Sequence, residues 1–359
     1  MIGARLKLAR AAAGLSLREL EDRLQGLVTA QAIGKYERNE MMPSSSVLIA
    51  LARTLNVTEE YLLNPADIDL VGVEFRKRKL TSVRETAEVQ ARILSEVERY
   101  LEIEQILAIN PPEVFPAKMR PRVTSIDEAE DAAKGLRKRW HLGDDAIPNL
   151  CEFLEEKGIK ICAIGLPGNV SGVQATVKSV DGAGVPVIVV NTNDPGERQR
   201  FTVTHELGHL YLDIPQQIDP EPLCHRFAGA FLVPAQMLQR EVGNYRHAIS
   251  LRELFQLKQL FGVSAQAVAY RCKDLGIISQ PTFSGVFKMF GGRGWRRNEP
   301  NALPKERPSR FERLCLRALA EEVISEAKAS ELLRKTVREV VESLDRPPEN
   351  VPDGHASRL

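Results

Sequence analysis

The most informative stretch of this chain is FTVTHELGH, at residues 201–209. The apolar residues in and around it predict a buried helix, on which side chains four positions apart lie on one face. His205 and His209 can therefore direct both imidazoles at one metal ion. Glu206 stands beside them, where it can deprotonate a water molecule on that ion without being a ligand. Because zinc lowers the pKa of such a water to about 7, the pattern predicts a zinc-dependent hydrolytic centre.

A third metal ligand should come from a carboxylate, a thiol or an imidazole on a neighbouring helix. A helix is predicted over residues 222–234, since a proline suits its first turn. Glu221 is the carboxylate candidate for the third ligand, and Cys224 and His225 are its rivals. Cys224 also suits a small packing residue, and the two histidines of the motif also fit a packing or capping role.

The composition of the 359 residues is that of an ordinary globular protein, with 43% hydrophobic and 27% charged residues. Lysine and arginine number 49 against 48 aspartates and glutamates, and this net charge of +1 argues against a polycationic tail that binds nucleic acid. Five cysteines, with no CxxC pair, indicate reduced thiols and a cytoplasmic protein. The most apolar stretch, residues 185–190, is too short to span a membrane, so no membrane partner is expected.

The first sixty-odd residues predict a bundle of five short helices. Ser16 is expected to cap the second helix, and Glu19 three residues later completes a capping box. Thr29 is placed to cap the third helix, and Pro43 lies beyond its end. These signals predict a small helical domain over residues 1–66.

The rest of the chain predicts helices around a small sheet. A long helix is expected over 82–109, and a proline-rich linker follows it. Strands are expected at 159–164, 170–177 and 185–191. The fold class is therefore multidomain and mainly α, with a small α+β part. The expected divisions are the N-terminal helical domain at 1–66, a helical linker at 67–125, the domain with the metal motif at 126–280, and C-terminal helices with a frayed tail at 281–359.

Residues 189–209, together with 221–228, resemble the ImmA/IrrE family of bacterial metallopeptidases. The resemblance covers about residues 127–278 and implies a zincin-like metallopeptidase domain. This chain has Cys224 and His225 where the family usually has Ala and Asn.

The resemblance also implies roles for individual residues. By position, His205, His209 and Glu221 would be the ligands of a Zn²⁺ cofactor, and Glu206 would be the general base. A protein substrate is implied as well, because enzymes of this family inactivate a repressor by cleaving it.

The N-terminal helices resemble the XRE-type helix-turn-helix of phage-repressor-like proteins. The matching runs are LREL at 17–20, QAIGKYER at 31–38 and Pro43. In such domains the third helix enters the major groove of double-stranded DNA. The resemblance therefore implies an operator as partner, and a homodimer on DNA because half-sites are usually read in pairs.

Particular residues of the third helix are candidates for DNA contact. Thr29, Gln31 and Lys35 would reach base edges, where glutamine can pair with adenine and lysine can reach guanine. Ala30 and Gly34 would permit close approach. The alternative is a helical protein-interaction module that no longer binds DNA, which the balanced charge of this segment suits.

These patterns predict a cytoplasmic transcriptional regulator that binds DNA and carries a zinc-dependent endopeptidase. It would control gene expression by cleaving a repressor-type protein, in trans or itself. The alternative is a non-catalytic transcription factor whose metallopeptidase-like domain senses a ligand or a partner. The two differ in one requirement, because only catalysis needs Glu206 and an open coordination position.

Overall fold

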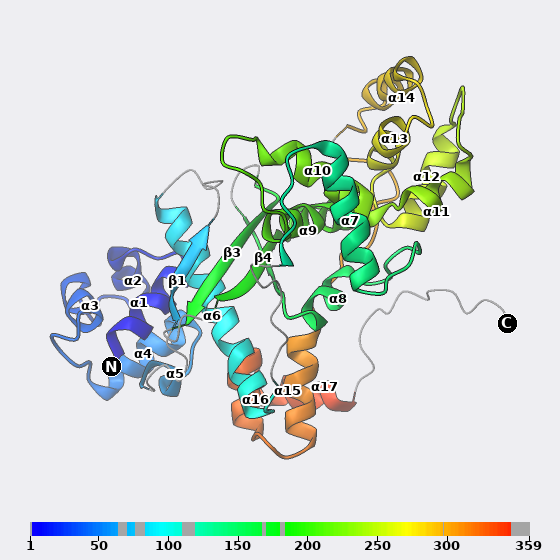
Figure 1. Cartoon of the computed structure of the whole chain (residues 1–359). Coiled ribbons are helices and arrows are strands. Elements are labelled where there is room, and N and C mark those ends of the chain that lie inside the picture. The colour runs from blue at the N-terminus through cyan, green and yellow to red at the C-terminus, as the bar shows by residue number, and fades with distance from the viewer. Residues whose placement is uncertain are drawn as a thin grey trace. The chain divides into compact units, whose positions relative to one another are not determined.

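The structure is a computed structural model, and the part of the chain that it describes consists mainly of helices, with one small sheet (Figure 1). The residues that it describes are 2–63, 70–75, 83–109, 119–166, 170–179, 184–296 and 298–345. The chain forms two compact units. The first comprises 1–70, 82–110 and 309–359, and the second comprises 71–81 and 111–308. The mainly α fold with a small sheet is the one that the sequence predicts.

The first unit begins with the five predicted helices. They are α1 (Ile2–Ala12), α2 (Leu17–Arg23), α3 (Ala30–Glu37), α4 (Ser45–Leu55) and α5 (Glu59–Leu63). Ser16 caps α2 in a capping box with Glu19, and the Thr29 hydroxyl accepts a hydrogen bond from the backbone N–H of Ala32 at the start of α3. The bundle closes around an aliphatic core in which Leu20 and Ile33 are fully buried.

Four more helices complete the first unit. They are α6 (Val83–Ile106), α15 (Arg310–Ala320), α16 (Glu326–Leu333) and α17 (Val337–Asp345). We expected α6 to be part of a linker, but it packs against α1 and α15. Ile93, Val97 and Tyr100 recur at helical spacing on α6 and are buried, because a stripe of this kind needs a cover. Residues 110–118 of the predicted linker lie outside the described residues.

The second unit contains a sheet of order β1-β3-β4-β2. The three predicted strands are present as β2 (Lys160–Ile164), β3 (Gly172–Ser179) and β4 (Gly184–Asn191). Strand β3 is antiparallel to β4, with Val173 opposite Val189, and β2 is parallel to β4, with Cys162 opposite the same residue. Strand β1 (Leu70–Phe75) was not predicted and lies within the predicted linker.

The second unit also contains eight helices among the described residues. They are α7 (Ile126–Arg139), α8 (Leu150–Glu156), α9 (Gly196–Tyr211), α10 (Pro220–Leu232), α11 (Ala235–Val242), α12 (Leu251–Phe261), α13 (Ala265–Asp274) and α14 (Gln280–Gly292). Helix α9 packs on β3, β4 and α10, and the buried side chains of Leu207, Phe227 and Phe231 join these elements in one core. None of the described helices combines the length and the apolarity that a membrane span needs.

A buried cation connects three parts of the second unit. The Lys258 ammonium lies 2.6 Å from the Glu197 carboxylate on α9 and 3.2 Å from that of Glu299, and it has no exposed surface. Glu299 also accepts hydrogen bonds from the backbone N–H groups of Ala265 and Gln266 at the start of α13. Because each buried charge has a partner, this arrangement fixes α9, α12 and α13 to one another.

The segment that follows Glu299 continues along the N-terminal ends of helices. Glu306 pairs with Arg200 of α9 and accepts 2.9 Å hydrogen bonds from the first two backbone N–H groups of α8. A Cβ atom at Gly196 would lie 2.1 Å from the carbonyl oxygen of Pro304, so only glycine fits at the start of α9. Residues 299–306 therefore hold in place the helix that carries the metal motif.

A second buried ion pair joins α7 to α13. Glu130 accepts two hydrogen bonds of 2.6 Å from the Arg271 guanidinium, and Arg226 lies 3.5 Å away. Burial alone would raise the pKa of the Glu130 carboxyl, but the hydrogen bonds and charge of Arg271, aided by Arg226, hold that pKa below 4.5.

Glu130→Gln should lower the free energy of unfolding of the second unit by about 3–5 kcal/mol at pH 7, because it leaves the buried Arg271 without its counter-charge. The folded-state pKa lies below the unfolded value, so the ion pair stabilises the protein above about pH 4.5 and loses this effect as the pH falls through the folded-state pKa. Urea unfolding of both proteins should be measured from about pH 3, below the ordinary pKa of a glutamate carboxyl, to about pH 8, well above it. The free energies of unfolding of the two proteins should converge at the acidic end of this range.

Asp131→Asn is the matched control for this change. Asp131 is the neighbouring residue, and its side chain is 76% exposed beside Lys134. Its loss should cost under about 1 kcal/mol. An equal effect of the two substitutions, or a constant difference between Glu130→Gln and the parent over the whole pH range, would contradict the prediction.

Candidate metal centre and nucleic-acid interface

Two helices that pack very closely build the candidate metal centre. A Cβ atom at Gly208 of α9 would lie 3.1 Å from Phe227 and 3.4 Å from Cys224, both on α10. The lack of a side chain at this position lets the backbones approach. At the start of α10, the Asp219 carboxylate accepts a hydrogen bond from the backbone N–H of Glu221, which fixes the first turn.

Three predicted ligands converge between these helices. The Nε2 atoms of His205 and His209 are 3.1 Å apart, and the Glu221 carboxylate lies 3.1 Å from the first and 3.4 Å from the second. Both histidines are buried, at 6% and 8% exposure. Among the described residues this is the only group of three or more such side chains whose ligand atoms all lie within 4.8 Å of one another. Two imidazoles and one carboxylate form a donor set that suits a divalent cation with an open fourth position.

The predicted base lies on the same helix and under a strand. Glu206 is 1% exposed. A Cβ atom at Gly172 of β3 would lie 3.5 Å from the Cγ of Glu206 and 2.4 Å from the side chain of Thr202. Strand β3 therefore passes directly beside the base, which only a glycine at this point of the strand permits. Gly172 was not among the predicted site residues, because its role depends on the contact of β3 with α9.

The two rivals for the third ligand occupy other positions. The Sγ atom of Cys224 lies 3.4 Å from Nδ1 of His209, the ring nitrogen other than the one near Glu221. The His225 ring lies 4.5 Å from the His205 ring and 5.6 Å from the Phe201 ring, measured between centroids. Neither side chain belongs to the group of converging ligand atoms.

A cavity of about 700 Å³ opens beside this centre, between α9, α10 and α13. Phe201 and His225, the two rings next to His205, are part of its wall. Arg296 lines it too, from the basic loop at 291–297, whose sequence suits either a phosphate or partner contact or a solvated loop. The cavity could not be predicted, because its walls come from segments that are far apart in the chain.

The candidate DNA contacts of α3 divide between two faces of the helix. Gln31 and Lys35 are exposed, as is Thr29, whose hydroxyl caps the helix. Ala30 is half-buried, and its backbone N–H donates to the Glu21 carboxylate. Gly34 was expected to permit close approach of DNA, but it is buried.

Gly34 faces the interior of the bundle instead of the exposed surface of α3. It is buried, and a Cβ atom there would lie 3.6 Å from Leu17 of α2 and 3.3 Å from the guanidinium of Arg38. Its small size therefore allows α2 to pack on α3.

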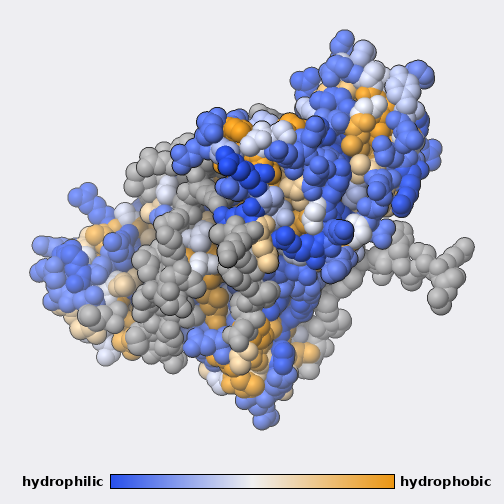
Figure 2. Space-filling model, viewed as in Figure 1, coloured by the Kyte–Doolittle hydropathy of each residue, from blue (hydrophilic) through white to orange (hydrophobic). Residues whose placement is uncertain are grey.

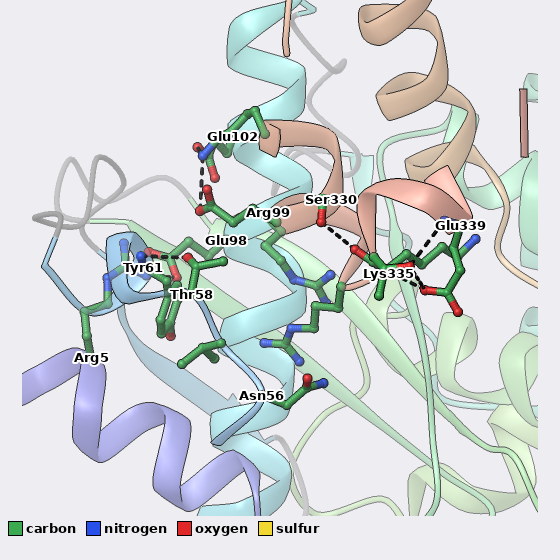
Figure 3. Close-up of a pocket in the computed structure, with 15 residues that line it drawn as sticks. Arg5, Asn56, Thr58, Tyr61, Glu98, Arg99, Glu102, Ser330, Lys335 and Glu339 are labelled. Carbon is green, nitrogen blue, oxygen red and sulfur yellow. Dashed lines mark hydrogen bonds and ion pairs between the residues drawn. The ribbon is translucent and has the colours of Figure 1, made fainter. Parts of the chain in front are cut away.

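A second cavity, of about 490 Å³, lies within the first unit (Figure 3). Arg5 of α1 forms an ion pair with Glu98 of α6, and its guanidinium lies 4.6 Å from the centre of the Tyr61 ring. Lys328 of α16 pairs with Glu102 on the same α6 helix. These contacts connect the N-terminal bundle, α6 and the C-terminal helices. None of the predicted site residues lines this cavity.

Two models of known families match parts of the chain. Residues 6–62 match the helix-turn-helix model, and residues 154–273 match the model of the IrrE N-terminal-like domain. A search of curated proteins found no match to the chain. The matched ranges contain the α3 candidates in one case and the converging His205, His209 and Glu221 in the other. The chain therefore joins an XRE-type helix-turn-helix domain to an IrrE/ImmA-like metallopeptidase domain.

Proposed function

We propose that this protein is a transcriptional regulator that binds operator DNA and carries an active zinc-dependent endopeptidase, through which it controls gene expression. The observation that carries the proposal is the convergence of His205, His209 and Glu221, with the buried carboxylate of Glu206 on the same helix. A site used only for packing would not need three donor atoms directed at one point.

The chemistry divides between the ion and the chain. Zinc fits the site because two histidines and a carboxylate leave one position open, and when bound it supplies the Lewis acidity that makes water nucleophilic at neutral pH. His205, His209 and Glu221 hold it. Glu206 accepts a proton from the attacking water and returns it to the amine that leaves as the peptide bond breaks.

Cys224 has a supporting role in this proposal. With Nε2 of His209 directed at the ligand group, Nδ1 carries the proton and donates to the Cys224 sulfur at 3.4 Å. This contact fixes the tautomer and the orientation of the ring. Glu221 is thus the third ligand, and Cys224 is a partner of a ligand.

DNA recognition is assigned to α3. Gln31 and Lys35 are exposed on this helix, where they reach base edges, while Thr29 and Ala30 flank them at its N-terminal end. The protein acts in the cytoplasm. It binds DNA as a homodimer, since helix-turn-helix domains of this type read paired half-sites.

The proposed substrate is a repressor-type protein, cleaved in trans, or this chain itself. The region proposed for self-cleavage, 110–125, is proline-rich, which favours an extended backbone. The second candidate function is a non-catalytic sensor, in which the metal only stabilises the fold.

The metal site can be tested by substitution in the full chain. His205→Ala combined with His209→Ala should abolish zinc binding, and Glu221→Ala should weaken it severely, because each removes a ligand. Cys224→Ala should weaken it by about 10–100-fold without abolishing it. Zinc content by mass spectrometry and chelator competition measure these effects.

Cys272→Ala is the control for the loss of a buried thiol, since Cys272 is also fully buried in the second unit. It should leave zinc affinity unchanged. Release of zinc by Cys224→Ala together with its retention by Glu221→Ala would show that the third ligand is misassigned.

DNA binding can be tested in the same way. Gln31→Ala and Lys35→Ala should each weaken binding to the protein's own promoter by about 1–3 kcal/mol, and affinity should fall steeply as salt is raised. Lys7→Ala removes one exposed positive charge from α1 and should have a smaller effect. Fluorescence anisotropy with promoter and random DNA measures both affinity and preference; equal affinity for the two DNAs would contradict operator recognition.

Glu206→Gln separates the peptidase from the sensor. It keeps the shape of the side chain but removes the base, so zinc should remain bound while proteolysis falls by at least about 100-fold. Wild-type and variant cells are compared for regulated transcripts and for fragments of candidate repressors and of this chain. Normal regulation in the variant, with zinc bound and no fragments in either strain, would exclude the peptidase and leave the sensor.

A further inference from the structure

The large cavity of the second unit extends from the metal centre along the same helix faces. On α9, Arg198 and Phe201 line the cavity, and His205 follows at the next helical turn. On α10, His225 and Gly229 line it, one and two turns beyond the start of the helix where Glu221 lies. The crevice between α9 and α10 thus holds the ligands at one end and the cavity at the other.

Two aromatic rings form the boundary between the cavity and the ligands. The His225 ring stacks on Phe201 with an angle of 30° between their planes, and its centroid is 4.5 Å from that of His205. Because both rings also line the cavity, a group that enters it lies next to a metal ligand. A substrate held with its scissile bond at the metal centre has a side chain within reach of this space.

The walls of the cavity suit an apolar group. Phe201, Pro222, Ala267 and Tyr270 contribute apolar surface. The Tyr270 ring is itself held by Phe283 and Phe287, at centroid distances of 4.8 and 5.0 Å. Apolar surface is also visible where α13 and α14 lie, at the upper right of Figure 2.

Three of the four arginines that line the cavity, Arg198, Arg226 and Arg271, already have partners in the protein, and the fourth, Arg296, is exposed. Arg271 is hydrogen-bonded to Glu130 at 2.6 Å, and Arg198 donates a 3.1 Å hydrogen bond to the hydroxyl of Ser171 and lies 3.6 Å from Asp194. These contacts leave the apolar walls as the main determinant of what the cavity accepts.

We propose that this cavity is the specificity pocket of the peptidase, and that it receives a large aromatic or long aliphatic side chain next to the scissile bond. The substrate class is therefore a protein segment with such a residue in an extended stretch. This inference rests on the proposed peptidase function. It adds selectivity among substrate side chains, which the metal centre alone does not provide. A pocket of this kind contributes through buried apolar area, so a benzyl group should be favoured over a methyl group by roughly 100-fold.

Gly229 allows the pocket to be filled by one substitution. A Cβ atom there meets only the side chain of Arg271, at 3.9 Å, so Gly229→Leu adds its first side-chain atom without displacing backbone, at a residue that lines the cavity. Gly135→Leu is the matched control. Gly135 is exposed on α7, within the same unit, and an added Cβ has no neighbour within 4 Å. Both variants exchange a helical glycine for leucine and gain the same helix propensity.

Binding is measured first, because it does not need turnover. The probes are two hydroxamates, which chelate zinc, that differ only in a benzyl or a methyl side chain, and calorimetry uses the zinc-loaded full chain. The parent and Gly135→Leu should prefer the benzyl probe by roughly 100-fold, and Gly229→Leu by less than about 5-fold, with the affinity for the methyl probe unchanged. Equal affinities of the parent for both probes, or a preference that persists in Gly229→Leu, would overturn the pocket.

Cleavage then distinguishes this inference from the function on which it rests. In a peptide library, the parent should cut beside large apolar residues, and Gly229→Leu should cut beside small ones. Cleavage without a side-chain preference would overturn the pocket and leave the peptidase intact. The absence of any cleavage by zinc-loaded parent, with the benzyl preference still present, would overturn the peptidase and leave the pocket as an apolar ligand site.

Discussion

The close packing of α9 on α10 is the constraint on which the candidate metal centre depends. At Gly208 the two helices approach so closely that a single Cβ atom would contact both Phe227 and Cys224. This approach brings the Glu221 carboxylate to the two Nε2 atoms and places the Cys224 sulfur behind the His209 ring. A larger spacing would separate the donors, and the same crevice would no longer join the metal centre to the apolar cavity.

Charge fixes the other end of α9. Glu197 is buried against Lys258 of α12, and Arg200 pairs with Glu306, so the first turns of the helix are held by two segments that lie 61 and 106 residues further along the chain. Buried charges are costly unless they are paired, and a fully paired network tolerates few alternative arrangements. The helix with the candidate ligands is therefore held by close packing at one end and by ion pairs at the other, and such rigid support is what a preorganised site requires.

In the first unit, the helix-turn-helix bundle of α1 to α5 packs against another helix of that unit. Helix α6 packs against α1 and α15, and Arg5 of the bundle pairs with Glu98 of α6. Helices near the end of the described chain, α15 to α17, therefore belong to the same compact unit as α3, although α3 ends at Glu37 and α15 begins only at Arg310.

Local sequence determined those features that depend on neighbours along the chain. The spacing of His205 and His209, the caps at Ser16 and Thr29, and three of the four strands follow from the periods of helix and strand and from capping chemistry. Only the tertiary structure shows that Glu221, and not Cys224 or His225, lies beside the Nε2 atoms of His205 and His209, because this depends on which face of α10 meets α9. The contact of Gly34 with α2, the position of Gly172 beside Glu206 and the packing of α6 against α1 and α15 also depend on the tertiary structure. Each of these is a contact between segments distant in sequence, for which no local pattern carries the information.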